Sequence, residues 1–169
     1  MALPRHELGR EIRCLMRSLR LATLSTGLAT SEGWPYGSMV TVAFDQGAHP
    51  LLLMSGLSDH TRNLAEDSRS SLLFLQPTRH RNPQRGSRVT VMGNIRKTNK
   101  PAHAARFLTM HPEAKMYAGF GDFNFYRMSV ERVHWVGGFA QAQWLDGQYV
   151  TLRTTAVRTI SDTESGVID

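Results

Sequence analysis

The 169-residue sequence lacks the patterns that build disulfide frameworks, membrane spans or metal clusters. Its one cysteine, Cys14, cannot form an intramolecular disulfide. No run of about 18 apolar residues occurs, which argues against a membrane-spanning helix. The seven histidines form no HxH or HExxH pair and CxxC is absent, so the spacing does not indicate a metal site. A G-x-S-x-G motif is also missing, which leaves hydrolase chemistry without support.

Lysine is scarce as well, with three residues among the 20 Lys and Arg. Arginine therefore supplies most of the positive charge in a chain whose formal net charge is +6. Arginine binds carboxylate and phosphate groups with a planar fork of donors, which suits an anionic ligand. The basic stretch 79–88 lacks interleaved aromatics, so nucleic acid is not expected as a partner. No apolar signal-peptide region is visible near the start, and this predicts a cytoplasmic protein.

Hydrophobic periodicity predicts a few helices and many short strands. Helices are expected over 5–19, 58–67 and 101–111. Strands are expected over 21–25, 36–44, 51–55, 71–76, 88–97, 125–136 and 148–153. The sequence therefore predicts a mainly β fold, an antiparallel barrel with peripheral helices, in a domain over 1–158 followed by a polar tail over 159–169.

Alternation along two of these strands predicts which side chains face the core. One face of the strand 36–44 is expected to hold Val40, Val42 and Phe44, and the inward face of the strand 88–97 is expected to hold Val89, Val91, Gly93 and Ile95. Cys14 falls within the predicted helix 5–19. We expect it to pack as a small apolar residue rather than to react.

Hydroxyl groups and an imidazole gather where the strand 51–55 gives way to a helix. They belong to Ser55, Ser58, His60 and Thr61. The first turn of a helix presents unpaired N–H groups and a partial positive charge, so this segment could bind a phosphate group. The alternative is an ordinary helix start, at which Ser58 only caps the helix.

Two segments rich in glycine and aromatic residues, 117–123 and 135–139, could border a planar ligand. Glycine lets the backbone approach such a ligand closely, and aromatic side chains can wall it. The alternatives are a turn whose aromatic residues pack in the core and, for the second segment, a β-bulge.

Six short motifs follow one another along the chain: PYGSMV at 35–40, LLLMS at 51–55, HTRNL at 60–64, RVTVMG at 88–93, AGFGDF at 118–123 and VGGF at 136–139. In this order and at this spacing they resemble the FMN-binding split-barrel superfamily. Within that superfamily the sequence is most similar to the haem-utilisation branch of the pyridoxamine-phosphate-oxidase-like proteins.

The resemblance implies a split barrel that forms a homodimer with FMN at its interface, and a flavin-dependent oxidoreductase of unassigned small-molecule substrate. It places FMN along one strand, beside the next strand and at the helix start, with an arginine that reaches across to the flavin and a tryptophan from the partner subunit that covers it. The corresponding residues are Ser38, Met39 and Val40; Met54 and Ser55; His60, Thr61 and Asn63; and Arg88 and Trp135.

The sequence departs from the oxidases proper at positions where they carry basic residues. Ser38, Asp59 and His60 stand there instead. No side chain is singled out as a general acid or base. Two alternatives to a flavoenzyme therefore stand: a haem-binding or haem-degrading protein without flavin, and a non-catalytic regulatory barrel that binds a ligand.

Overall fold

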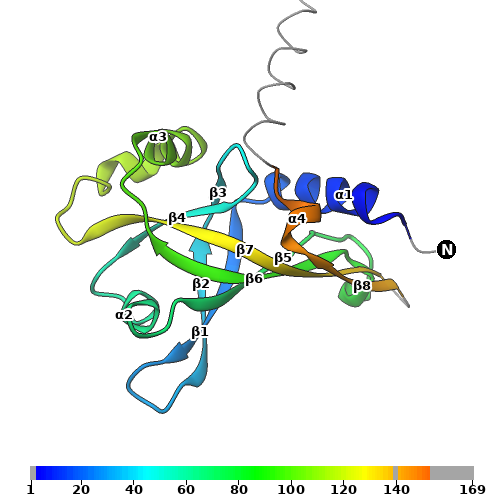
Figure 1. Cartoon of the computed structure of the whole chain (residues 1–169), viewed down its shortest axis with the longest axis horizontal. Coiled ribbons are helices and arrows are strands. Elements are labelled where there is room, and N and C mark those ends of the chain that lie inside the picture. Colours follow the sequence, from blue (N-terminus) through cyan, green and yellow to red (C-terminus); the bar gives the residue numbers. More distant parts are fainter. Residues whose placement is uncertain (1–2, 139–140, 153–169) are drawn as a thin grey trace, which may run out of the picture.

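The computed structural model describes residues 3–138 and 141–152, which form a curled antiparallel sheet with helices along its margins (Figure 1). The sheet order is β2-β1-β5-β6-β7-β4-β3, and β8 pairs with the far half of β7. The strands are β1 (Leu21–Leu28), β2 (Trp34–Thr41), β3 (Ala43–Phe44), β4 (Pro50–Ser55), β5 (Arg69–Leu75), β6 (Arg88–Lys97), β7 (Phe123–Gly138) and β8 (Gln141–Asp146). The prediction of a mainly β fold with peripheral helices is confirmed.

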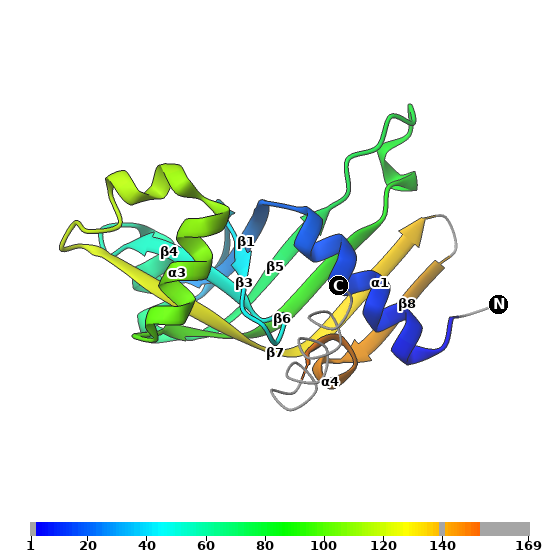
Figure 2. The ribbon, with the colours of Figure 1, turned by 90° about the horizontal axis from the view of Figure 1, so that it is seen from above.

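In Figure 2, α3 lies over one end of the sheet, whereas α1 crosses the other end with α4 beside it. Helix α3 packs on β3 and β4, α2 packs on β1, and α1 contacts α4. The helices are α1 (Arg5–Ser18), α2 (Asp59–Glu66), α3 (Pro101–Met110) and α4 (Gly147–Val150), with short 3-10 turns η1 (Pro83–Arg85) and η2 (Pro112–Met116). Within the ranges that the structure describes, no helix is long and apolar enough to cross a bilayer.

The core fills the concave side of the sheet, as the alternation predicted. The expected inward residues of β2, β3 and β6 are all buried, and Val42, which lies between β2 and β3, is buried with them. From α1 they are joined by Leu8, Ile12 and Met16, which lie on one stripe of that helix. A second, smaller core forms where Phe107 of α3 packs over β4.

Cys14 does not pack in this core, so the expectation for it is wrong: its side chain is exposed. Residue 14 lies about 200° around the helix axis from Ile12, because each residue advances the helix by about 100°. Cys14 therefore lies outside the apolar stripe that Ile12 and Met16 form.

The chain after β7 also differs from the prediction. Residues 148–150 form part of α4 rather than a strand, and β8, which was not predicted, precedes it. Asp146 stands at the N-cap position, and Gly147 lies so close to β7 that a Cβ there would fall 2.5 Å from the carbonyl oxygen of Val130. Residue 153, the boundary at 158 and the tail 159–169 lie outside the described residues.

A one-residue bulge in β7 sets the faces of the sheet near β8. Met92 pairs with Arg132 while Gly93 pairs with Val130, so Glu131 is the extra residue. Val130 packs against the core and Val133 is buried within it, although the two positions are three apart rather than two or four. The bulge makes this odd spacing compatible with one buried face.

Candidate functional site

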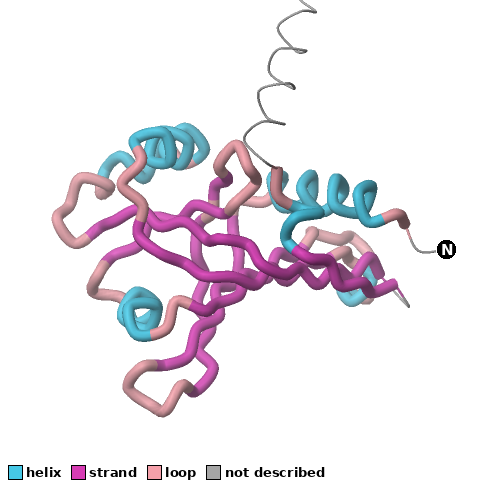
Figure 3. The backbone as a smooth tube through the Cα atoms, in the orientation of Figure 1, coloured by secondary structure: helices cyan, strands magenta, loops and turns pink. Residues whose placement is uncertain are grey.

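The side chains expected to surround a phosphate do meet at the start of α2. His60 joins this helix to β2, because its Nδ1 lies 3.2 Å from Ser38 Oγ. Its Nε2 lies 2.8 Å from Ser58 Oγ, which is 2.9 Å from Thr61 Oγ1. Ser55 at the end of β4 bonds to the Asp122 carboxylate just before β7. The tube in Figure 3 shows the loop into α2 beside the loop into β7.

The polar side chains of this cluster form hydrogen bonds with one another. Ser58 Oγ donates to the Ser55 carbonyl oxygen at 2.7 Å, so it can only accept from its other two neighbours. Thr61 Oγ1 and His60 Nε2 must then donate to Ser58, which leaves His60 Nδ1 to accept from Ser38 Oγ. The network closes on itself and directs none of these four side-chain protons toward a ligand.

The charge at the helix start also suits phosphate poorly. Burial lowers the pKa of His60, which keeps the ring neutral near pH 7. Asp59 places a carboxylate in the first turn of α2, and the Arg62 guanidinium lies 3.4 Å from it. The side chains of this cluster therefore offer no free proton and no net positive charge to an FMN phosphate, and FMN binding stays a prediction of the resemblance.

The other predicted FMN contacts are distributed over the molecule. Met54 and Val40 are buried in the main core, whereas Met39 points to the opposite face and is 73% exposed. Asn63 is buried and holds the β1–β2 hairpin. The structure thus brings Ser38, Ser55, His60 and Thr61 together, and it places the other side chains elsewhere.

Arg88 and Trp135 lie at the far end of the sheet from α2. Arg88 starts β6, and the cavity at α2 touches Ile95, seven residues further along. Seven residues of strand span about 23 Å. Trp135 faces α1 and lines a cavity of about 550 Å³ together with Cys14 and Leu15. Its indole covers Gly137, where a Cβ would lie 2.2 Å from the ring.

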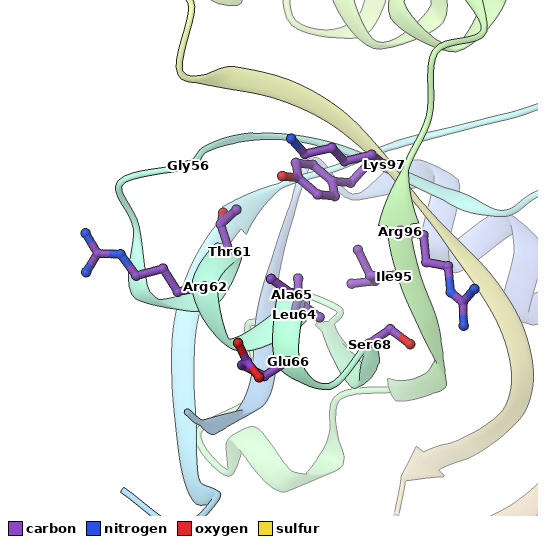
Figure 4. A pocket seen from close by; sticks show the side chains of 11 residues that line it. Gly56, Thr61, Arg62, Leu64, Ala65, Glu66, Ser68, Ile95, Arg96 and Lys97 are labelled. Atoms are coloured by element: carbon purple, nitrogen blue, oxygen red, sulfur yellow. The ribbon is translucent and has the colours of Figure 1, made fainter. Parts of the chain in front are cut away.

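A cavity of about 610 Å³ separates α2 from β6 (Figure 4). Thr61 and Leu64 line it from α2, and Ile95 and Lys97 line it from β6. In Figure 4 the Arg62 side chain extends away from this cavity. The cavity thus adjoins the hydroxyl cluster through Thr61 alone.

The alternative interpretation of the segment 117–123, a turn whose aromatic residues pack in the core, is confirmed in part. Tyr117 and Phe123 pack together at a ring distance of 5.0 Å and join the second core, whereas Phe120 is exposed. In the segment 135–139, the register of β7 shifts between Val136 and Gly138, which agrees with a bulge. Phe139 lies outside the described residues.

The outer face of the sheet, which the sequence patterns did not predict, is defined here by Thr23, Leu73, Thr90 and His134. Successive strand pairs place these residues in one row from β1 to β7. Met39 extends the row on β2 and Trp144 extends it on β8. Five large apolar side chains are exposed on this face: Leu21, Met39, Leu75, Met92 and Trp144. Alternation within the predicted strands could have indicated the face, but not its register.

At the β8 end this face changes from apolar to aromatic and cationic. The rings of His134 and Trp144 stack at 4.5 Å with an angle of 20° between their planes. The Arg132 guanidinium carbon lies 4.9 Å from the centre of the Trp144 ring. Arg88 lies on the same face, because it pairs with Val136 two residues beyond His134. We call Arg88, Arg132, His134, Val136 and Trp144 the β8 patch.

A second polar cluster, which the sequence analysis also missed, surrounds the buried Asp45. Its carboxylate accepts from Arg127 Nε at 2.7 Å and from the backbone N–H of His49 at 2.9 Å. His103 Nε2 lies 3.9 Å from the same carboxylate. These groups line a cavity of about 780 Å³ between α3 and the β3–β4 turn.

The free energy of unfolding should fall as the pH drops below about 6.5. Burial lowers the pKa of both His49 and His103 from the ordinary 6.5. The unfolded chain then takes up protons at a higher pH than the folded chain does. This contribution to stability is complete above pH 6.5 and is lost as the pH falls toward the lower folded-state pKa values. Urea midpoints at pH 7.5 and 5.5 measure it, and His103→Asn should shrink the difference; an unchanged difference would contradict this origin.

Comparisons with known proteins show the family of this chain. The family described as "CREG, beta-barrel" matches residues 4–151. The chain is 33% identical over 142 residues to the chloroplastic noncanonical haem oxygenase HOZ of Arabidopsis thaliana, a match that covers 82% of this chain and 43% of that protein. A solved haem-binding protein from Mycobacterium smegmatis is 30% identical with a TM-score of 0.78, over 89% of this chain and 61% of that one.

ChuZ of Campylobacter jejuni has the same fold, with 18% identity and a TM-score of 0.74 over 89% of this chain and 63% of that one. This chain spans less than two thirds of the length of each of these three relatives. The split-barrel resemblance inferred from the six motifs is confirmed. The chain belongs to the CREG β-barrel family, whose fold is that of the pyridoxamine-phosphate-oxidase-like split barrels.

Proposed function

We propose that this chain binds haem, as cargo or as substrate. The observation that carries the proposal is its 33% and 30% identity, over most of its length, to a protein named as a haem oxygenase and to one named as a haem-binding protein. Haem therefore replaces FMN as the first candidate ligand. Degradation of haem is the finer proposal, and it rests on the first of these relatives alone.

The β8 patch offers the chemistry that haem requires. Haem combines a flat apolar ring system with two carboxylates, so a site needs an apolar or aromatic surface and neighbouring cations. Trp144 is 49% exposed there and Val136 adds aliphatic surface. Arg88 and Arg132 stand on either side of His134 along the sheet. The β8 patch thus has the kinds of side chain that a haem site requires. The hydroxyl cluster at α2, in contrast, offers no free side-chain proton to an FMN phosphate.

A second copy of this chain is the proposed partner for the apolar part of the outer face. Leu21, Met39 and Leu75 are each more than half exposed, and no charged side chain separates them in the row through Thr23 and Leu73. Monomeric proteins rarely leave a contiguous apolar surface of this kind open to water. The homodimer that the resemblance implies would cover it and leave the β8 patch at its margin.

Titration of the purified protein with ferric haem should produce a saturable Soret band distinct from that of free haem. Light scattering on the same sample reports whether the complex has the mass of two chains. Adding ascorbate in air then separates cargo from substrate, since degradation would remove the Soret band faster than for free haem. A spectrum that never departs from free haem would refute haem binding, and a yellow protein that releases FMN would restore the flavin prediction.

A further inference from the structure

We propose that His134 supplies the nitrogen ligand to the haem iron, an inference that rests on the proposed haem binding. The chain has seven histidines, and their surroundings differ. A histidine that binds haem iron must offer a ring nitrogen that the protein does not already use, and it must reach the surface on which haem lies.

Three of the seven histidines are occupied inside the protein. His103 is buried and its Nδ1 lies 2.8 Å from Thr98 Oγ1. His111 is buried with Nε2 at 2.8 Å from the Val42 carbonyl oxygen. His49 Nδ1 contacts the backbone of Met128 and Val130 in β7. None of these rings can turn toward an external ligand without breaking contacts that hold the fold.

Two more histidines use both ring nitrogens. His60 bonds to Ser38 and Ser58, as described above. His80, in the loop before η1, accepts from the backbone N–H of Asn82 at Nδ1, and its Nε2 lies 3.2 Å from Arg85. Among the described residues, only His6 and His134 make no hydrogen bond through either ring nitrogen.

The surroundings favour His134 over His6. His6 lies near the exposed start of α1 and meets Tyr149 edge-on at 5.2 Å. His134 lies within β7, between Thr90 on β6 and Trp144 on β8, and stacks on the Trp144 indole. The stacked ring is held in place by its neighbour, while neither ring nitrogen is taken. Strand and stacking thus fix the ligand on a rigid part of the fold.

The charges around His134 complement haem. Arg132 lies two residues before it on β7, and Arg88 is paired with Val136 two residues after it. Two residues of strand correspond to about 7 Å, so the two arginines extend from positions on opposite sides of His134 along the sheet. The Arg88 guanidinium donates to the Gln84 carbonyl oxygen, and the Arg132 guanidinium lies over the Trp144 ring. A porphyrin bound through His134 would therefore have a cation within reach on either side for its carboxylates.

His134→Ala should abolish the bound Soret band and weaken ferric haem binding at least tenfold, while free imidazole restores the band. His6→Ala is the matched control, since it removes the other unengaged histidine, and we expect it to bind as the unaltered chain does. His134→Gln, which keeps a polar side chain of similar size, should lose the band as well. Circular dichroism and urea midpoints verify that all three variants fold.

The outcomes separate this inference from the proposed function. If the unaltered chain shows no bound Soret band, haem binding itself fails, and the assignment of His134 fails with it. If the unaltered chain binds haem and His134→Ala has the same Soret maximum and affinity, only the assignment is overturned. Loss of the band in His6→Ala alone would likewise overturn it.

Discussion

Gly93→Ala should lower the free energy of unfolding by about 3 kcal/mol, toward the upper end of the range for overpacked interior sites. A Cβ at residue 93 would fall 2.0 Å from the Ser129 carbonyl oxygen and 3.2 Å from the Val130 Cα across the β6–β7 pair. These are backbone atoms of a central strand, so no side-chain rotation can make room. Urea denaturation followed by circular dichroism measures the loss.

Gly37→Ala is the matched control for this substitution. Gly37 also lies in a strand, β2, but the only atom near its added Cβ would be a methyl carbon of Thr23 at 3.8 Å, an ordinary contact. Alanine also restricts the unfolded chain more than glycine does, so this variant should be neutral or slightly more stable. Equal midpoints for the two variants would contradict the close approach at Gly93.

Gly93 also bears on the proposed site, because it faces the bulge that orients the β8 patch. The pairing shifts between Met92 and Gly93, and Arg132 and His134 lie just beyond the extra residue Glu131. If alanine forces the two strands to pair in another register, the side chains beyond the bulge change faces. Haem binding should therefore fall in Gly93→Ala even at temperatures where the chain stays folded.

Local patterns predicted the core but not the outer face. Alternation identified Val40 and Val89 as buried because each strand carries its own signal of period two. The row from Met39 to Trp144 depends on pairings between strands distant in sequence, which no single strand encodes. β8 was missed because its six residues are mostly exposed and show only Leu145 buried. A short half-exposed strand has little periodicity to detect.

The cluster at α2 was predicted in its members but not in its bonding. The spacing of Ser58, His60 and Thr61 at a helix start indicated that they would meet, and the resemblance added Ser38. The directions of their hydrogen bonds depend on distances to the Ser55 carbonyl oxygen and to β2, which appear only in the folded chain. Those directions leave no free side-chain proton in the cluster, while phosphate binding there stays a prediction.

Asn63→Ala should lower the free energy of unfolding by about 2–3 kcal/mol, although the resemblance assigns this residue to FMN. Asn63 is 2% exposed, its Oδ1 accepts from the Ala29 N–H at 2.9 Å, and its Nδ2 donates to Thr26 Oγ1 at 2.9 Å. Alanine removes two hydrogen bonds and leaves a backbone donor without its partner. Urea denaturation measures the loss, and the thermal midpoint should fall in parallel.

Arg62→Ala, one residue earlier on α2, provides the comparison. Its exposed ion pair with Asp59 contributes little, because water and salt screen such pairs, so this variant should unfold close to the unaltered chain. The structural role of Asn63 further implies that haem affinity stays unchanged in Asn63→Ala, since α2 and the β8 patch occupy opposite ends of the sheet. A variant that kept full stability but lost binding of added FMN would show instead that Asn63 serves a ligand.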